Sequence, residues 1–187
     1  MKKLLFIINP KAGVKKNKHF VEDALEIFEK AGYKVGVKYT KKRADGTRIA
    51  RDYGAKADLI VCMGGDGTLN EVMQGMLEGE ISTPLGYIPA GSTNDFANSL
   101  GLRTNPKDQA EFIMETEAKS LDLGWFNGRY FVYTASAGIF TETSYSTPQE
   151  LKNKLGHFAY ILHGIREVFK IRRLKLRIET EDEVYEN

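Results

Sequence analysis

The first half of the chain alternates between short apolar runs and stretches in which apolar residues recur at helical spacing. Residues 4–8 are continuously apolar, which is typical of a strand buried on both faces of a parallel sheet. Residues 20–31 have helical periodicity, and Gly32 can end that helix in the left-handed conformation. Residues 33–40 alternate between apolar and polar side chains, which predicts a strand with one solvated face.

The same order of elements continues to about residue 115. Helices are predicted over residues 44–53 and 69–78, and strands over residues 58–63 and 85–88. Asn105 and Pro106 are typical of a cap and first position of a further helix. Strands that alternate with helices predict an α/β fold with a doubly wound, mostly parallel sheet. Ligands of such sheets bind beyond the carboxyl ends of the strands, so we expect the loops 9–13, 40–43, 64–68 and 89–97 to converge.

The pattern changes after Ser120. Two β-rich runs, residues 121–126 and 129–134, flank the pair Asn127 and Gly128, a strong signal for a hairpin. We therefore predict a first, α/β domain over residues 1–120 and a second, β-rich domain over residues 121–187. Within the second region, a helix is predicted over about residues 148–169. A strand is predicted around Leu174, Leu176 and Ile178.

Composition limits the class of protein. Of 187 residues, 42% are hydrophobic and 28% are charged, as in ordinary globular proteins. The sequence has no apolar run of the ~18 residues that a membrane span requires. Cys62 is the only cysteine, which excludes an intrachain disulfide and a cysteine-based zinc site. It falls in a predicted buried strand, where a small hydrophobic residue is expected. A cytoplasmic location is the resulting prediction.

A glycine-rich stretch follows the strand at residues 58–63. Gly64, Gly65 and Gly67 let the backbone approach a ligand closely, and the N–H groups of the next helix suit phosphate. We predict Thr68 as the N-cap of that helix, with Glu71 at the capping-box position. Asp66 stands among the glycines, where a carboxylate suits Mg²⁺, a substrate hydroxyl or a proton to be removed. The alternative is a tight turn in which Asp66 caps the helix.

Four motifs together resemble one family. They are residues 9–13 (NPKAG), 64–72 (GGDGTLNEV), 89–97 (PAGSTNDFA) and 121–124 (LDLG). This set resembles the catalytic domain of soluble bacterial diacylglycerol kinases and related lipid kinases, including sphingosine kinases. One departure is Ser92, which stands where the family usually has threonine, and a serine hydroxyl offers the same hydrogen bonding.

The resemblance implies an ATP-dependent lipid kinase that uses Mg²⁺, with a nucleotide-binding domain over residues 1–120 and an incomplete, β-rich substrate domain over residues 121–187. Such an enzyme transfers the γ-phosphate of ATP to a lipid hydroxyl, such as that of diacylglycerol, which gives phosphatidic acid. Asp66 is the implied catalytic residue, with Asp95 and Asp122 as second choices, and no metal ligands are assigned. The residues implied to line the nucleotide are Asn9, Pro10, Lys11, Ala12, Gly13, Thr40, Gly65, Asp66, Gly67, Thr68, Leu69, Asn70, Glu71 and Ser92.

Two other functions share these signals. The glycine–aspartate core also resembles that of NAD kinases, and a non-catalytic nucleotide-binding module would need the same loops. Relatives in the lipid-kinase family are longer, so the chain is expected to be a fragment that ends within its second domain and binds nucleotide. The resemblance also implies a homodimer and peripheral association with a membrane. Six basic residues could meet an anionic membrane surface or, alternatively, form the solvated face of a helix and a strand: Arg166, Lys170, Arg172, Arg173, Lys175 and Arg177.

Overall fold

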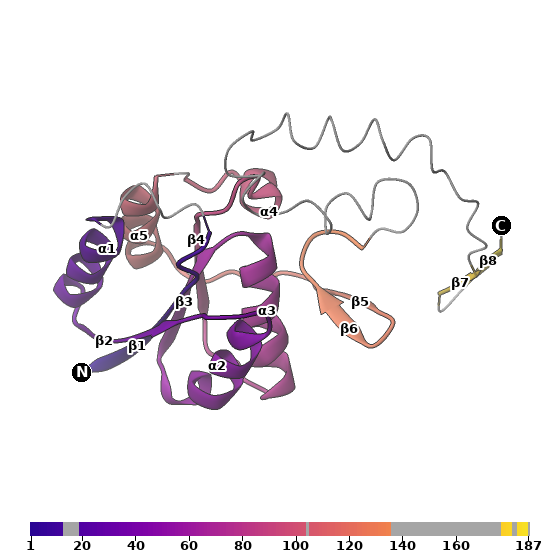
Figure 1. Cartoon of the computed structure of the whole chain (residues 1–187), viewed down its shortest axis with the longest axis horizontal. Coiled ribbons are helices and arrows are strands. Elements are labelled where there is room, and N and C mark those ends of the chain that lie inside the picture. The colour runs from indigo at the N-terminus through magenta and orange to yellow at the C-terminus, as the bar shows by residue number, and fades with distance from the viewer. Residues whose placement is uncertain (13–18, 104, 136–176, 181–182, 187) are drawn as a thin grey trace. The chain divides into compact units, whose positions relative to one another are not determined.

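Four parallel strands form the central sheet of the first part of the chain (Figure 1). The computed structural model describes residues 1–12, 19–103, 105–135, 177–180 and 183–186. The strands are β1 (Lys2–Ile8), β2 (Tyr33–Tyr39), β3 (Leu59–Gly64) and β4 (Leu85–Pro89), in the order β2-β1-β3-β4. These strands confirm the predicted parallel α/β architecture. The edge strand β2 alternates between half-buried and exposed residues over most of its length, as its sequence predicts.

Helices cover both faces of the sheet (Figure 1). On one face, α1 (His19–Lys30) packs against β1, where the rings of Phe6 and Phe28 meet edge-on at 5.4 Å, and α5 (Pro106–Glu115) packs against β4. On the other face lie α2 (Asp45–Tyr53), α3 (Asp66–Glu78) and α4 (Asp95–Ser99), and a short 3-10 turn, η2 (Gly54–Lys56), follows α2. The predicted caps at Gly32 (φ 87°) and Asn105 are confirmed.

The strand register brings the exit loops to one edge of the sheet. Ile8 of β1 pairs with Tyr39 of β2 and with Met63 of β3, and Met63 pairs with Ile88 of β4. The residues that follow these positions therefore lie in one row. Backbone hydrogen bonds continue the row beyond the strands, from Asn9 N to Met63 O at 2.9 Å and from Thr40 N to Ile8 O at 2.9 Å. The predicted convergence of the loops is thus confirmed for their described residues.

The start of α3 differs from the prediction. The helix begins at Asp66 and its N-cap is Gly65, so Thr68 belongs to the first turn and the predicted capping box is wrong. The Thr68 side chain is 7% exposed, and its hydroxyl accepts a hydrogen bond from Asn9 instead of capping its own helix. Glu71 likewise bonds to another helix, as described below. Sequence rules predict the cap at Thr68 because it has a hydroxyl, whereas the N-cap in the structure is Gly65, which has no side chain.

Two short strands, β5 (Gly124–Phe126) and β6 (Arg129–Phe131), form the predicted antiparallel hairpin. Asn127 and Gly128 both have positive φ, 47° and 79°, as the tight turn requires. Tyr130 N donates to Gln74 Oε1 of α3 at 3.2 Å, and the compact unit Met1–Thr134 includes this hairpin. The proposed functional boundary at residue 120 stays a prediction.

The second compact unit spans Ala135–Asn187, of which the structure describes a small part. There β7 (Arg177–Glu179) pairs antiparallel with β8 (Val184–Glu186), which confirms a strand around Ile178 and adds a partner that was not predicted. The helix predicted over residues 148–169 and the basic residues 166–175 lie outside the described residues. Within the described part of the chain, no helix is both long enough and apolar enough to cross a bilayer.

Candidate functional site

The loops after the adjacent strands β1 and β3 meet where these strands connect to helices on opposite faces of the sheet. The helix after β1 covers one face of the sheet and the helix after β3 covers the other, and sheets of this type bind their ligands at the edge where two such adjacent strands end. A side-chain hydrogen bond from Asn9 Nδ2 to Thr68 Oγ1, 2.9 Å long, joins the two loops. Asn9 Oδ1 also accepts from Lys11 N at 3.0 Å, which fixes the start of the first loop.

The loops after β3 and β4 touch through two glycines. A Cβ atom on Gly91 would lie 2.6 Å from the Cα atom of Gly65, so there is no room for a side chain at Gly91. Asn94, in the left-handed conformation (φ 54°), closes the second loop. Its Oδ1 accepts from Gly91 N at 2.8 Å and its Nδ2 donates to Gly91 O at 3.0 Å. Asn94 was not among the residues predicted for the site, although asparagine after a glycine–serine turn is a signal for this geometry.

Asp66 joins the same two loops. Its Oδ2 accepts from Asp95 N at 3.0 Å and its Oδ1 accepts from Phe96 N at 3.2 Å. These two N–H groups are at the start of α4, so Asp66 caps a neighbouring helix and not its own. Asp66 therefore has a structural function whether or not it takes part in chemistry.

Side chains cap three helices whose N-termini the structure describes. Glu71 accepts hydrogen bonds at the start of α2, Asp66 at the start of α4, and Asn105 at the start of α5. The start of α3 differs, because its N-cap Gly65 has no side chain. Among the described residues, no acceptor contacts the backbone N–H groups of Asp66 and Gly67. A Cβ atom on Gly67 would have no other atom within 4 Å, so this turn faces open space among the described atoms.

Donors of this kind at the positive end of a helix dipole suit an anion such as phosphate. The helix start lies beside Asn9 and beside the loop of Gly91, at the edge where parallel sheets of this type bind their ligands. The arrangement can therefore hold the phosphates of a nucleotide.

A comparison with protein families matches residues 3–126 to the diacylglycerol kinase catalytic domain. The chain belongs to this family. The matched segment contains every loop described above. Membership confirms the resemblance that the four sequence motifs indicated.

Relatives of the diacylglycerol kinase family match nearly the whole chain. A diacylglycerol kinase of Staphylococcus saprophyticus is 37% identical over 186 residues, which cover 99% of this chain and 61% of the relative. A diacylglycerol kinase of Bacillus subtilis (strain 168) is 36% identical over 188 residues, which cover 100% of this chain and 62% of the relative. The crystal structure of a diacylglycerol kinase from Bacillus anthracis str. Sterne has a TM-score of 0.73 and 30% identity, over 100% of this chain and 61% of that one. The chain thus spans about three fifths of the length of these relatives.

Five of the residues that the family resemblance implies are brought to one place. Asn9, Gly65, Asp66, Gly67 and Thr68 surround the start of α3, and Thr40 is buried at the end of β2. The others differ in exposure. Pro10, Lys11 and Ser92 are exposed, Ala12 is buried, Asn70 is half-buried, and Gly13 lies outside the described residues. Of the second-choice carboxylates, Asp95 starts α4 and Asp122 is exposed before the hairpin.

Leu69 and Glu71 have other neighbours. The Leu69 side chain is 1% exposed and packs in the core, so only its backbone can face a nucleotide. Glu71 accepts hydrogen bonds from two backbone N–H groups of the β2–α2 segment, at 2.8 and 3.1 Å.

Two buried groups near the glycine loop are protonated at neutral pH. Burial raises the pKa of Tyr87, and the charge of Asp66 raises it further. The Tyr87 hydroxyl donates to Gly64 O at 3.2 Å, which attaches it to the first residue of the glycine-rich stretch. Burial also raises the pKa of Cys62, with a smaller effect from Glu71. Cys62 is fully buried, which agrees with its predicted role as a small core residue.

Proposed function

We propose that this chain carries the nucleotide-binding region of an ATP-dependent lipid kinase. The enzyme would transfer the γ-phosphate of ATP to the hydroxyl of a lipid such as diacylglycerol, giving phosphatidic acid. Because that acceptor resides in a bilayer, the reaction would take place at a membrane surface, with the protein associated peripherally. The proposal is supported by family membership and by the relatives named diacylglycerol kinase.

One observation carries the nucleotide part of the proposal. The start of α3 has N–H donors without a described acceptor, it faces open space at Gly67, and it lies where the β1, β3 and β4 loops meet. The N–H groups of Asp66 and Gly67 would bind phosphate oxygens. Asn9 would hold the first turn of α3 in place through its hydrogen bond to Thr68.

The transfer needs little covalent chemistry from the protein. A bond forms between the lipid oxygen and the γ-phosphorus, while the bond from that phosphorus to its bridging oxygen breaks and ADP leaves. The hydroxyl proton passes to a carboxylate or to water. Phosphoryl transfer is accelerated mainly by positioning and by offsetting charge, which is what a rigid set of loops can supply.

The residues present fit Mg²⁺ in the manner of phosphate sites, where one or two carboxylates and the phosphates share the ion. No group of three or more potential metal ligands occurs among the described residues, so a site made by protein alone is not expected there. Asp66 is the carboxylate at the junction of the loops, and two N–H groups fix its orientation. Mg²⁺ would offset the charge of the phosphates when bound. We therefore favour Asp66 as a metal-holding group over a proton acceptor.

Nucleotide binding tests the first half of the proposal. Mg²⁺–ATP at about 100 times its Kd should stabilise the chain by about 2.7 kcal/mol, a rise in Tm of about 10 °C for a unit of this size. The chain would be heated with Mg²⁺–ATP, with Mg²⁺–ADP and with Mg²⁺ alone. No rise at millimolar nucleotide would contradict the proposal.

Transfer of label from radioactive ATP tests the second half. For an enzyme with the full length of the relatives, we expect label in lipid when diacylglycerol is presented in mixed micelles, and none when NAD is the acceptor; residues 1–187 alone should transfer little or no label to lipid. Label in NAD would favour the NAD kinase alternative. Nucleotide binding without transfer to either acceptor would favour a nucleotide-binding module.

A further inference from the structure

Glu71 lies in the second turn of α3, but its carboxylate accepts hydrogen bonds from the start of α2. Its Oε1 accepts from Ala44 N at 2.8 Å and its Oε2 accepts from Gly46 N at 3.1 Å. Ala44, the N-cap of α2, has a left-handed backbone (φ 65°) and no capping side chain of its own. The distant Glu71 therefore replaces a local cap and places a negative charge at the positive end of α2.

The two helices are close enough for this contact because glycines line their interface. A Cβ atom on Gly46 would lie 2.9 Å from Glu71 Cβ and 3.0 Å from Glu71 Oε2. One turn further along α3, a Cβ atom on Gly75 would lie 2.1 Å from Thr47 O. The position of α2 relative to α3 is therefore fixed by backbone contact.

The turn before α2 is held from its other side by Asp45. The Asp45 Oδ2 atom accepts from Lys41 N at 2.8 Å and from Lys42 N at 3.2 Å. Thr40 N donates to Ile8 O, which attaches the start of the turn to the end of β1. The segment from Thr40 to Gly46 thus forms one unit, with its basic residues exposed at the ligand-binding edge of the sheet.

We infer that Glu71 is a positioning residue, which sets the Thr40–Gly46 segment against α3 so that this segment can contact the nucleotide. This inference rests on the proposed function. Both Glu71 oxygens already have donors, so a direct bond to the nucleotide is not its role. The nucleotide is bound with its phosphates at the start of α3, and Glu71 connects that start to the segment at the end of β2.

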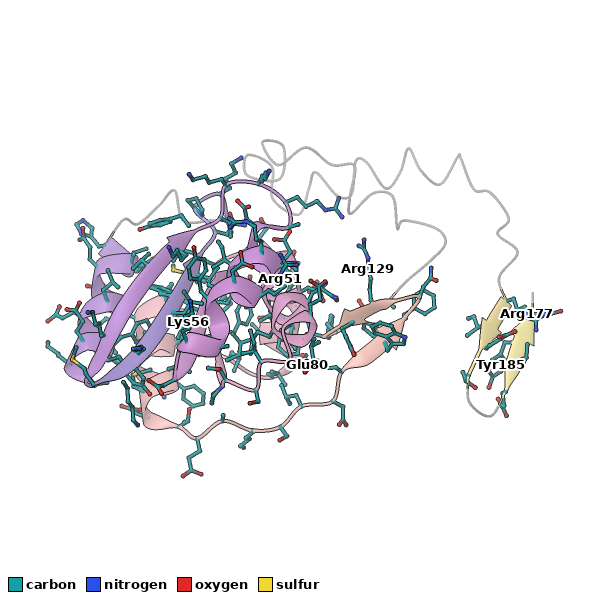
Figure 2. All side chains as sticks on the ribbon, turned by 90° about the horizontal axis from the view of Figure 1, so that it is seen from below. Arg51, Lys56, Glu80, Arg129, Arg177 and Tyr185 are labelled. Atoms are coloured by element: carbon teal, nitrogen blue, oxygen red, sulfur yellow. The ribbon has the colours of Figure 1, made fainter. Side chains whose placement is uncertain are left out.

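Glu71→Gln tests the inference, with Glu78→Gln as the matched control. Glutamine offers one acceptor oxygen and turns an NH₂ group toward the second N–H, so the segment opens more often. Glu78 lies on the same helix, about 18 Å from its start. It pairs at 3.4 Å with Arg51 of α2, and Arg51 is labelled in Figure 2. The control therefore weakens another polar contact between the same two helices, far from the site.

Two measurements on the whole chain separate the possible roles. Amide exchange at Ala44 and Gly46 reports the capping bonds, and calorimetric titration with Mg²⁺–ATP reports affinity. In Glu71→Gln we expect the exchange rate to rise by about tenfold or more, and the Kd to rise by a smaller factor that is set by the loss of the closed fraction, because only the closed segment binds. Glu78→Gln should leave both at their wild-type values.

Gly46→Ala disturbs the same contact by a change in α2 instead of α3. It leaves the Glu71 side chain chemically intact but forces it away from the start of α2. We expect a higher Kd, and we expect Glu71→Gln combined with Gly46→Ala to be less harmful than the sum of the two changes, because both break one contact. This variant also keeps the inference testable if Glu71→Gln does not fold.

Each contrary result is distinct. A raised Kd in Glu71→Gln with wild-type exchange at Ala44 and Gly46 would show a direct ligand and overturn the inference. Faster exchange with a wild-type Kd would also overturn it, since Glu71 would then be a structural cap alone. If the wild-type chain binds no nucleotide, the proposed function itself fails, and that result needs no variant.

Discussion

Gly91→Ala should separate the two loops that meet at the candidate site. The new Cβ atom would lie 2.6 Å from Gly65 Cα and 2.8 Å from Asn94 Oδ1. A side-chain oxygen can rotate away, but the backbone of Gly65 is held between β3 and α3. The loops must therefore move apart by about 1 Å to reach an ordinary van der Waals distance.

The cost follows from what this movement breaks. Asp66 holds the second loop through hydrogen bonds from Asp95 N and Phe96 N, at 3.0 and 3.2 Å, and a further ångström removes both. Two hydrogen bonds contribute about 2 kcal/mol together. If the bonds survive, the strain of overpacking remains and costs a similar 1–3 kcal/mol, roughly the same loss. For the unit Met1–Thr134, this corresponds to a fall in Tm of about 7 °C.

Thermal unfolding of the nucleotide-free chain measures this loss, and Gly67→Ala is the matched control. Its Cβ atom meets nothing within 4 Å, so the substitution should leave Tm unchanged or raise it slightly. With Mg²⁺–ATP, both variants should show a smaller rise in Tm than the wild-type chain. A Gly91→Ala chain with wild-type Tm would show that the loops do not touch, and the reasoning would be wrong.

Two further predictions concern carboxylates. The N–H of Lys41 is the main cause that holds the pKa of Asp45 below its usual 3.8, with burial acting in the opposite direction. The Asp45 carboxylate therefore stabilises the fold above pH 3.8, and this contribution is lost as the pH falls through the lowered native pKa. In Asp45→Asn, the free energy of unfolding from urea titrations should fall less steeply with decreasing pH in the acid range. An unchanged dependence on pH would contradict this. Asp66→Asn should remove phosphotransfer and also lower the free energy of unfolding by about 1–2 kcal/mol, because one capping bond to α4 is lost. Wild-type stability and label transfer in that variant would refute both roles.

Periodicity alone predicts much of this fold. Residues 20–31 and 69–78 each have one apolar stripe, and the structure has helices there. The apolar runs at residues 4–8 and 58–63 became the two central strands because only strands covered on both faces can be so uniformly apolar. The hairpin followed from Asn127 and Gly128, which tolerate positive φ.

The bonds that build the site were not predictable in this way. Asn9 and Thr68 are 59 positions apart, and Glu71 and Ala44 are 27 apart. Local rules predict that Thr68 and Glu71 cap their own helix, because its first N–H groups are the nearest backbone donors without a partner. The strand register decides otherwise, since it brings the loops of other strands within reach of the same side chains. Partners of this kind depend on the whole sheet.

The arrangement of carboxylates explains how an acidic residue can stand in a turn that we propose binds phosphate. An aspartate at the first position of a helix would ordinarily lie near its own N–H groups and compete with an anion there. Asp66 is instead drawn to the start of α4, and Glu71 is drawn to the start of α2. Each negative charge is offset by the positive end of another helix. The donors at the start of α3 are left for a ligand, and the two helices that supply this compensation are fixed around them.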